Sequence, residues 1–222
     1  MKRISVIFDV DGTLLNTEPL YMEAWRQAAR QLGFTMSEEY LQKTRGLNVN
    51  DAIALFSEYF DTAHTYQEVR RIRTVVAEDL IAKTEGAALL KPFAREALDE
   101  LDRMGIPKAV ATSTEKSKNE AHLRHADLLG RFPVMIAGDM VTNGKPNPDI
   151  FLAAAAQLGA DPADCVVVED SPAGIEAAFR AGMRSVLIPD CVKPDAKTLE
   201  RANARLSSLE ELPGILKTWM EE

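Results

Sequence analysis

The stretch Ile4-Ser5-Val6-Ile7-Phe8-Asp9-Val10-Asp11-Gly12-Thr13 combines a strand-like apolar run with two closely spaced acidic residues. Four of its first five residues are apolar, as is typical of a short strand buried on both faces of a sheet. Two carboxylates follow with one residue between them, and residues two apart in an extended segment point to the same side. Asp9 and Asp11 can therefore face one cavity before Gly12 turns the chain. Their like charges repel unless a cation or a shared proton relieves them, so the stretch indicates either a metal site or an acidic strand-to-turn exit.

Length and charge restrict the class of protein. With 222 residues, the chain can form one large domain or a domain with an insertion, and it can bury a substantial core. Its net charge of −8 argues against a nucleic-acid-binding protein, which needs basic patches to hold phosphates. Any anionic ligand must therefore be held by local positive charge. We expect a small-molecule ligand and a monomer, with a dimer left open.

The lack of a recognisable membrane or secretory segment and the small number of cysteines favour the cytoplasm. No segment approaches the roughly 18 uninterrupted apolar residues that a membrane helix needs, and the apolar run after Met1-Lys2-Arg3 is too short for a secretory signal. We therefore expect no membrane association. The two cysteines, Cys165 and Cys191, imply no disulfide framework, which favours a reducing compartment. His122 and His125 lie three apart in a polar helical stretch, where we expect both on the surface rather than at a metal.

A long helical block follows the first strand. Apolar residues recur at helical intervals between Thr17 and Glu85, and no part of this block resembles a strand. Ser37, followed by two acidic residues, is a typical helix start. We expect helices over residues 18–32, from Ser37 onward, over 50–60 and over 66–83. The block predicts an inserted all-α domain, 17–85, which we interpret as a cap.

From Pro92 onward, helical and strand-like segments alternate. Strands separated by helices of about ten to fifteen residues are typical of βαβ units and a parallel sheet. The fold class is therefore α/β, with a Rossmann-like parallel sheet core over 1–16 and 86–222 that is interrupted by the helical cap. The expected strands are 108–111, 134–137, 165–168 and 185–188, and the expected helices are 93–104, 115–128, 147–158, 171–182 and 209–220.

Polar residues stand where the predicted strands end. Ligands of open parallel sheets bind beyond the carboxyl ends of the strands, so these residues are expected along one edge. Lys145 adds a cation just before a predicted helix. The strand-end groups are Asp9-Val10-Asp11-Gly12-Thr13, Thr112-Ser113-Thr114 and Glu169-Asp170-Ser171.

Each of these groups has a structural alternative. Thr112 with Glu115 three residues later could form a capping box. Asp170 or Ser171 could be an N-cap before Pro172, and Lys145 could lie in a solvated loop. Acidic residues and hydroxyls at successive strand ends, together with a lysine just before a helix, favour a single site.

The order of these motifs resembles that of the haloacid dehalogenase superfamily of phosphohydrolases. The resemblance extends over nearly the whole chain, and the helical block is similar to the cap of the branch that contains β-phosphoglucomutase and phosphoglycolate-type phosphatases. Gly144-Lys145-Pro146 and Glu169-Asp170-Ser171-Pro172-Ala173-Gly174 closely resemble that branch.

The resemblance implies a role for each acidic residue. Asp9 would be the nucleophile that forms an aspartyl-phosphate, and Asp11 would protonate the leaving oxygen and later take a proton from water. A Mg²⁺ ion would be held by the Asp9 carboxylate, the Asp11 main-chain carbonyl and Asp170, with Glu169 bound directly or through water. Oxygen ligands of this kind suit Mg²⁺.

The resemblance also implies how the phosphoryl group is held. Thr112 and the Ser113 amide would bind its oxygens, where N–H groups at a helix start favour anions. Lys145 would neutralise both the phosphate and Asp9. Such groups stabilise the charge that spreads over a transferring phosphoryl group.

Departures from the family favour a phosphatase. The dehalogenases lack the second aspartate, and Asp11 is present, which favours phosphoryl chemistry. The phosphoglucomutase branch carries a His at the start of the cap and an Arg after its glycine loop, where this chain has Tyr21 and Val49. We therefore expect Mg²⁺-dependent hydrolysis of a small phosphorylated metabolite, such as a sugar phosphate. The alternatives are a phosphosugar mutase and a non-catalytic sensor, although a sensor would be expected to lose Asp9, Asp11 or Lys145.

The cap is expected to set the substrate. We place Glu18, Tyr21, Arg45 and Asn48 over the active site as candidate specificity residues. Three arginines, Arg70, Arg71 and Arg73, point in different directions around a predicted helix. This favours a solvated face over a substrate clamp.

Overall fold

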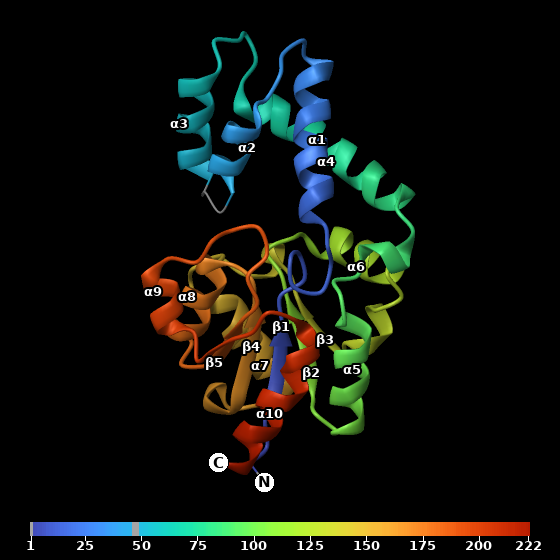
Figure 1. Ribbon diagram of the computed structural model, residues 1–222, viewed down its shortest axis with the longest axis vertical. Helices are drawn as coiled ribbons and strands as arrows, with labels where there is room; N and C mark the ends of the chain where they lie inside the picture. The colour runs from blue at the N-terminus through green and yellow to red at the C-terminus, as the bar shows by residue number, and fades with distance from the viewer. Residues whose placement is uncertain (1, 46–48) are drawn as a thin grey trace. The chain divides into compact units, whose positions relative to one another are not determined.

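The computed structural model describes residues 2–45 and 49–222, so the candidate specificity residue Asn48 lies outside the described residues. The chain divides into two compact units (Figure 1). The larger unit comprises Met1–Asn16 and Gly86–Glu222, and the smaller unit is Thr17–Glu85. Our interpretation of the smaller unit as a cap stays a prediction.

The larger unit is built on a six-stranded parallel sheet. The chain forms β1 in the middle, adds two strands on one side of it and then continues with β4 on the other side. The order of the strands therefore reverses between β1 and β4, and ligands of such sheets bind at this point. Along the sheet, the strands are β3 (Val134–Ile136), β2 (Lys108–Ala111), β1 (Ser5–Phe8), β4 (Cys165–Glu169), β5 (Arg184–Leu187) and β6 (Ala204–Arg205).

Helices cover both faces of the sheet. Val6 and Phe8 of β1 belong to a buried cluster with Leu98 and Leu216, whereas Ile7 belongs to a second cluster with Phe151. Alternate residues of a strand point to opposite faces, so α5 and α10 cover one face and α7 the other. The α/β prediction is confirmed. The helices of this unit are α5 (Ala94–Arg103), α6 (Lys116–His125), α7 (Asp149–Leu158), α8 (Pro172–Arg180), α9 (Ala196–Arg201) and α10 (Leu212–Glu221).

Helix α6 is shorter than predicted, and its histidines differ in exposure. The helix ends at His125 because Asp127 has a φ of 56°, a left-handed conformation that a helix cannot continue through. The prediction that both histidines lie on the surface is wrong for His122, which is buried. His122 shares one face of α6 with the buried Asn119 and Leu123, at the spacing of a helix face turned towards the core.

The smaller unit contains four helices among its described residues, α1 (Glu18–Gln31), α2 (Glu38–Thr44), α3 (Val49–Tyr59) and α4 (Tyr66–Lys83). Its core is aromatic, with Trp25, Tyr40 and Phe56 in one buried cluster. Helix α4 begins with a capping box between Thr65 and Glu68. Within the described ranges, no helix combines the length and the apolar character that a membrane span needs.

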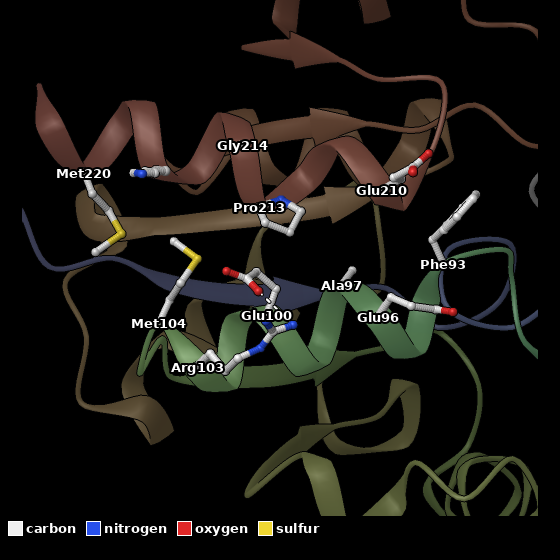
Figure 2. Close-up of a pocket in the computed structure, with 11 residues that line it drawn as sticks. Phe93, Glu96, Ala97, Glu100, Arg103, Met104, Glu210, Pro213, Gly214 and Met220 are labelled. Carbon is white, nitrogen blue, oxygen red and sulfur yellow. Dashed lines mark ion pairs between the residues drawn. The ribbon is translucent and has the colours of Figure 1, made fainter.

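A cleft of about 750 Å³ lies between α5 and α10. Figure 2 shows Phe93 and Glu96 at one end of this cleft and Met104 and Met220 at the other. Within the part of the chain that the structure describes, its lining shares no residue with the strand-end groups that the sequence points to. Those groups gather elsewhere, at the carboxyl ends of the strands.

Candidate active site

Three carboxylates meet at the carboxyl ends of β1 and β4. Phe8 pairs with Val168, and the Asp9 amide donates to the Val168 carbonyl at 2.9 Å. The parallel register therefore brings Asp9 beside Glu169 and Asp170, which end β4 and follow it. One carboxylate oxygen from each of the three lies within 4.8 Å of the others, and all three side chains are buried. The register of β1 and β4 thus brings together carboxylates that lie 160 residues apart in sequence.

Lys145 joins two of these carboxylates. Its Nζ donates to Asp9 Oδ1 at 2.5 Å, to Glu169 Oε1 at 2.8 Å and to the Ala111 carbonyl at 3.1 Å. The side chain is only 6% exposed, so Lys145 does not lie in a solvated loop. Burial lowers the pKa of Lys145, but the carboxylates of Asp9 and Glu169 outweigh this effect, so the net shift is upward and the ammonium stays charged.

The acidic groups carry more charge than Lys145 can balance. Burial raises the pKa of Asp9 and of Asp170, and the nearby Glu169 adds to both shifts, whereas Lys145 opposes them. If all three carboxyl groups are ionised, they carry two more charges than the one ammonium neutralises, and a divalent cation supplies this difference. Carboxylate oxygens are also the ligands that Mg²⁺ prefers. The donor set therefore fits Mg²⁺.

Ser171 orients the Glu169 carboxylate. The Ser171 amide and hydroxyl both donate to Glu169 Oε2, at 2.7 Å and 2.8 Å. The same hydroxyl accepts from the Gly174 amide at 3.1 Å, so Ser171 is also the N-cap of α8. The N-cap alternative is therefore correct for Ser171, and it coexists with a role in holding Glu169.

Two glycines leave room for the acidic cluster. Gly12 has a φ of 85°, and a Cβ at this position would lie 2.4 Å from Asp170 Oδ2. A Cβ at Gly174 would lie 1.7 Å from Glu169 Oε1. Neither distance is possible for real atoms, so any side chain at these positions must displace a carboxylate.

We expect Gly174→Ala to weaken Mg²⁺ binding by on the order of tenfold, because it moves Glu169, and groups that orient metal ligands have effects of this size. The measurement is the rise in melting temperature during a Mg²⁺ titration. Gly214→Ala is a matched control, since Gly214 is also the third residue of a helix and a Cβ there meets nothing within 4 Å. Equal Mg²⁺ responses in the two variants would contradict the prediction.

Asp11 and the loop after β2 form the other side of the site. Asp11 is half-buried, and the Thr114 hydroxyl donates to its Oδ2 at 2.8 Å. Thr112 is buried, and its hydroxyl accepts from the Thr114 amide at 3.1 Å. Helix α6 begins at Lys116 with Glu115 as its N-cap, so the capping-box alternative for Thr112 is wrong. The exposed Ser113 lies between the two threonines.

The hydrogen bond between Thr114 and Asp11 could not be predicted from the sequence. Thr114 belongs to the strand-end group of Thr112 and Ser113, but Asp11 lies 103 residues away in sequence. No local pattern marks a hydroxyl for a distant carboxylate. Only the pairing of β1 with β2 brings the two loops together.

The candidate specificity residues lie in the smaller unit. Glu18 and Tyr21 stand in the first turn of α1, and Arg45 follows α2 as its C-cap. The guanidinium of Arg73 stacks on the Tyr21 ring, 4.2 Å from its centroid, so the expectation of a purely solvated arginine face is wrong for Arg73. The role of these residues in substrate choice stays a prediction.

The chain is similar to known proteins over most of its length. The family model described as haloacid dehalogenase-like hydrolase matches residues 5–182. A phosphorylated carbohydrates phosphatase from Thermotoga maritima is 36% identical over 216 residues, which are 96% of this chain and 98% of that protein. Hexitol phosphatase B from Escherichia coli O157:H7 is 33% identical over 94% of both chains. The solved structure of a candidate β-phosphoglucomutase from Thermotoga maritima superposes with a TM-score of 0.80 at 32% identity, over 97% of this chain and 99% of its own.

Proposed function

Because this chain belongs to the haloacid dehalogenase-like hydrolase family, we propose that it is a Mg²⁺-dependent phosphoric monoester hydrolase of a small phosphorylated metabolite. The observation that carries this proposal is the buried Lys145 ammonium between Asp9 and Glu169, beside Asp170. A buried ion pair with surplus negative charge is costly for stability, which supports a catalytic purpose. Relatives that resemble the chain over almost its full length are phosphatases of carbohydrates and hexitols.

In the first step, an Asp9 carboxylate oxygen attacks the phosphorus of the ester. An oxygen–phosphorus bond forms to Asp9 as the bond to the leaving oxygen breaks, and Asp11 gives its proton to that oxygen. The products of this step are the free alcohol and an aspartyl-phosphate. Lys145 stays within hydrogen-bonding distance of Asp9 and holds the nucleophile in place.

In the second step, water attacks the phosphorus of the aspartyl-phosphate. Asp11 takes the proton of this water, the bond to Asp9 breaks, and inorganic phosphate leaves with Asp9 restored as a carboxylate. Thr112, the Ser113 amide and Lys145 bind the phosphoryl oxygens in both steps. Asp9, Asp170, Glu169 and the Asp11 carbonyl would hold Mg²⁺, which supplies positive charge to the phosphoryl oxygens when it is bound.

We expect the purified protein to release phosphate from at least one sugar or hexitol phosphate in Mg²⁺, and EDTA to abolish this release. The test is a phosphate-release screen of phosphorylated carbohydrates, with thermal unfolding measured in parallel. Mg²⁺ should raise the melting temperature, because a ligand that binds only the folded state stabilises it. Full activity in EDTA would contradict the metal assignment, and no turnover of any phosphate ester would contradict the hydrolase.

A phosphosugar mutase is the second candidate, supported by the likeness to the candidate β-phosphoglucomutase. It differs from a hydrolase in the acceptor of the phosphoryl group, which is a sugar hydroxyl instead of water. Conversion of β-glucose 1-phosphate to glucose 6-phosphate without free phosphate would favour the mutase. The candidate specificity residues Glu18, Tyr21, Arg45 and Asn48 can be ranked in the same screen by alanine substitution.

A further inference from the structure

We propose that Thr114 is a positioning residue that holds Asp11 in the orientation needed for proton transfer to the leaving oxygen. The inference rests on the proposed phosphatase function and extends it to a residue outside the acidic cluster. Its basis is the 2.8 Å hydrogen bond from Thr114 Oγ1 to Asp11 Oδ2.

Thr114 is itself held in place by its backbone. Its amide donates to the buried Thr112 hydroxyl at 3.1 Å, and its carbonyl accepts from the Gly138 amide at 3.1 Å. A Cβ at Gly138 would lie 2.3 Å from the Ser113 carbonyl oxygen, so the two loops pack as closely as a glycine allows. With both backbone groups bound, the Thr114 side chain has little freedom except at χ1, and the rotamer present aims the hydroxyl at Asp11.

The hydrogen bond fixes the orientation of the Asp11 carboxyl group. The Thr114 hydroxyl and Asp11 Oδ2 lie 2.8 Å apart, so rotation of the carboxyl group about its Cβ–Cγ bond would break this contact. A carboxyl group held in one orientation can give its proton to the leaving oxygen without first turning towards it. Removing the Thr114 hydroxyl takes this contact away, so a smaller fraction of the molecules has Asp11 in the orientation for proton transfer.

Leaving groups distinguish this role from a merely structural one. An alkoxide from a hexitol phosphate is a poor leaving group and needs the proton of Asp11, whereas p-nitrophenolate is stable as an anion and leaves without it. The ratio kcat/KM reports the steps up to the first irreversible one, which includes cleavage of the ester but not hydrolysis of the aspartyl-phosphate. A defect in proton donation therefore appears in kcat/KM for the alkyl ester alone.

The experiment compares Thr114→Val and Thr114→Ser with the wild type, using sorbitol 6-phosphate and p-nitrophenyl phosphate in saturating Mg²⁺. We expect Thr114→Val to lower kcat/KM for the alkyl ester by on the order of tenfold to a hundredfold, a part of what general acid catalysis contributes. The value for p-nitrophenyl phosphate should change by less than about threefold, which is well below the contribution of a general acid. Thr114→Ser keeps the hydroxyl and should restore turnover of the alkyl ester.

Controls separate this inference from the function on which it rests. Thr218→Val removes an exposed hydroxyl that donates to the Gly214 carbonyl within its own helix, and it should leave kcat/KM unchanged for both substrates. Melting curves with and without Mg²⁺ verify that each variant is folded. Equal losses on both esters, or failure of Thr114→Ser to restore activity, would overturn the role of Thr114 while leaving the phosphatase in place. If the wild type does not hydrolyse sorbitol 6-phosphate, the best alkyl ester of the phosphate screen takes its place, and a wild-type protein that hydrolyses no ester of that screen contradicts the phosphatase itself, with which the role of Thr114 falls.

Discussion

Asp9→Asn is expected to lower turnover by about 10⁴-fold or more, the scale seen when a covalent nucleophile is removed. The amide has nearly the same size as the carboxylate but cannot attack phosphorus at a useful rate. The structure gives this substitution little effect on folding, because Lys145 keeps its bond to Glu169 and the acidic cluster loses one of its repelling charges. The measurement is kcat with the best substrate of the phosphate screen, together with the melting temperature.

The control for Asp9→Asn is Asp127→Asn, the same chemical change at an aspartate whose side chain is 90% exposed. The left-handed φ of Asp127 also suits asparagine. Asp9→Ala checks that the residual rate of the asparagine variant does not come from slow deamidation back to aspartate. An Asp9→Ala protein with unimpaired turnover would end the covalent mechanism.

Lys145→Met has the second largest expected effect, on both stability and activity. Removing one partner of a buried ion pair costs about 3–5 kcal/mol, because the remaining charges stay buried without compensation. Here three carboxylates would be left together. Turnover should fall by on the order of 10²-fold or more, since Lys145 also neutralises the transferring phosphoryl group.

Magnesium tests the physical reason for that loss of stability. A divalent cation at the same carboxylates supplies the missing positive charge. Mg²⁺ should therefore raise the melting temperature of Lys145→Met by more than it raises that of the wild type. Lys108→Met is the matched control. Lys108 is also a buried lysine, 5% exposed, but it lies at the amino end of β2, and its partner Asp102 is 49% exposed. Its loss should lower stability independently of Mg²⁺ and leave kcat unchanged. The charge argument is wrong if the two variants respond to Mg²⁺ alike.

The secondary structure could be predicted where its pattern was long enough. Helix α4 matches its predicted bounds of 66–83 because apolar residues recur along it at helical spacing. Strand β2 matches its predicted bounds of 108–111 because it contains a short apolar run between a helical segment and a polar one. Helix α9 and strand β6 were missed, since six and two residues are too few to display a period. The buried His122 was misplaced because a polar residue carries no local sign that it faces the core.

The parallel sheet and the group of polar residues at its carboxyl edge could be predicted from the sequence alone. Both follow from local chemistry, since a buried strand must be apolar and a residue that ends it can be polar. Which of these residues are in contact depends on how the whole chain folds. Lys145 and Asp9 lie 136 residues apart in sequence, and Thr114 and Asp11 lie 103 apart. Such contacts depend on the order and register of the strands, which arise from packing across the whole unit and leave no pattern in any single stretch of the chain.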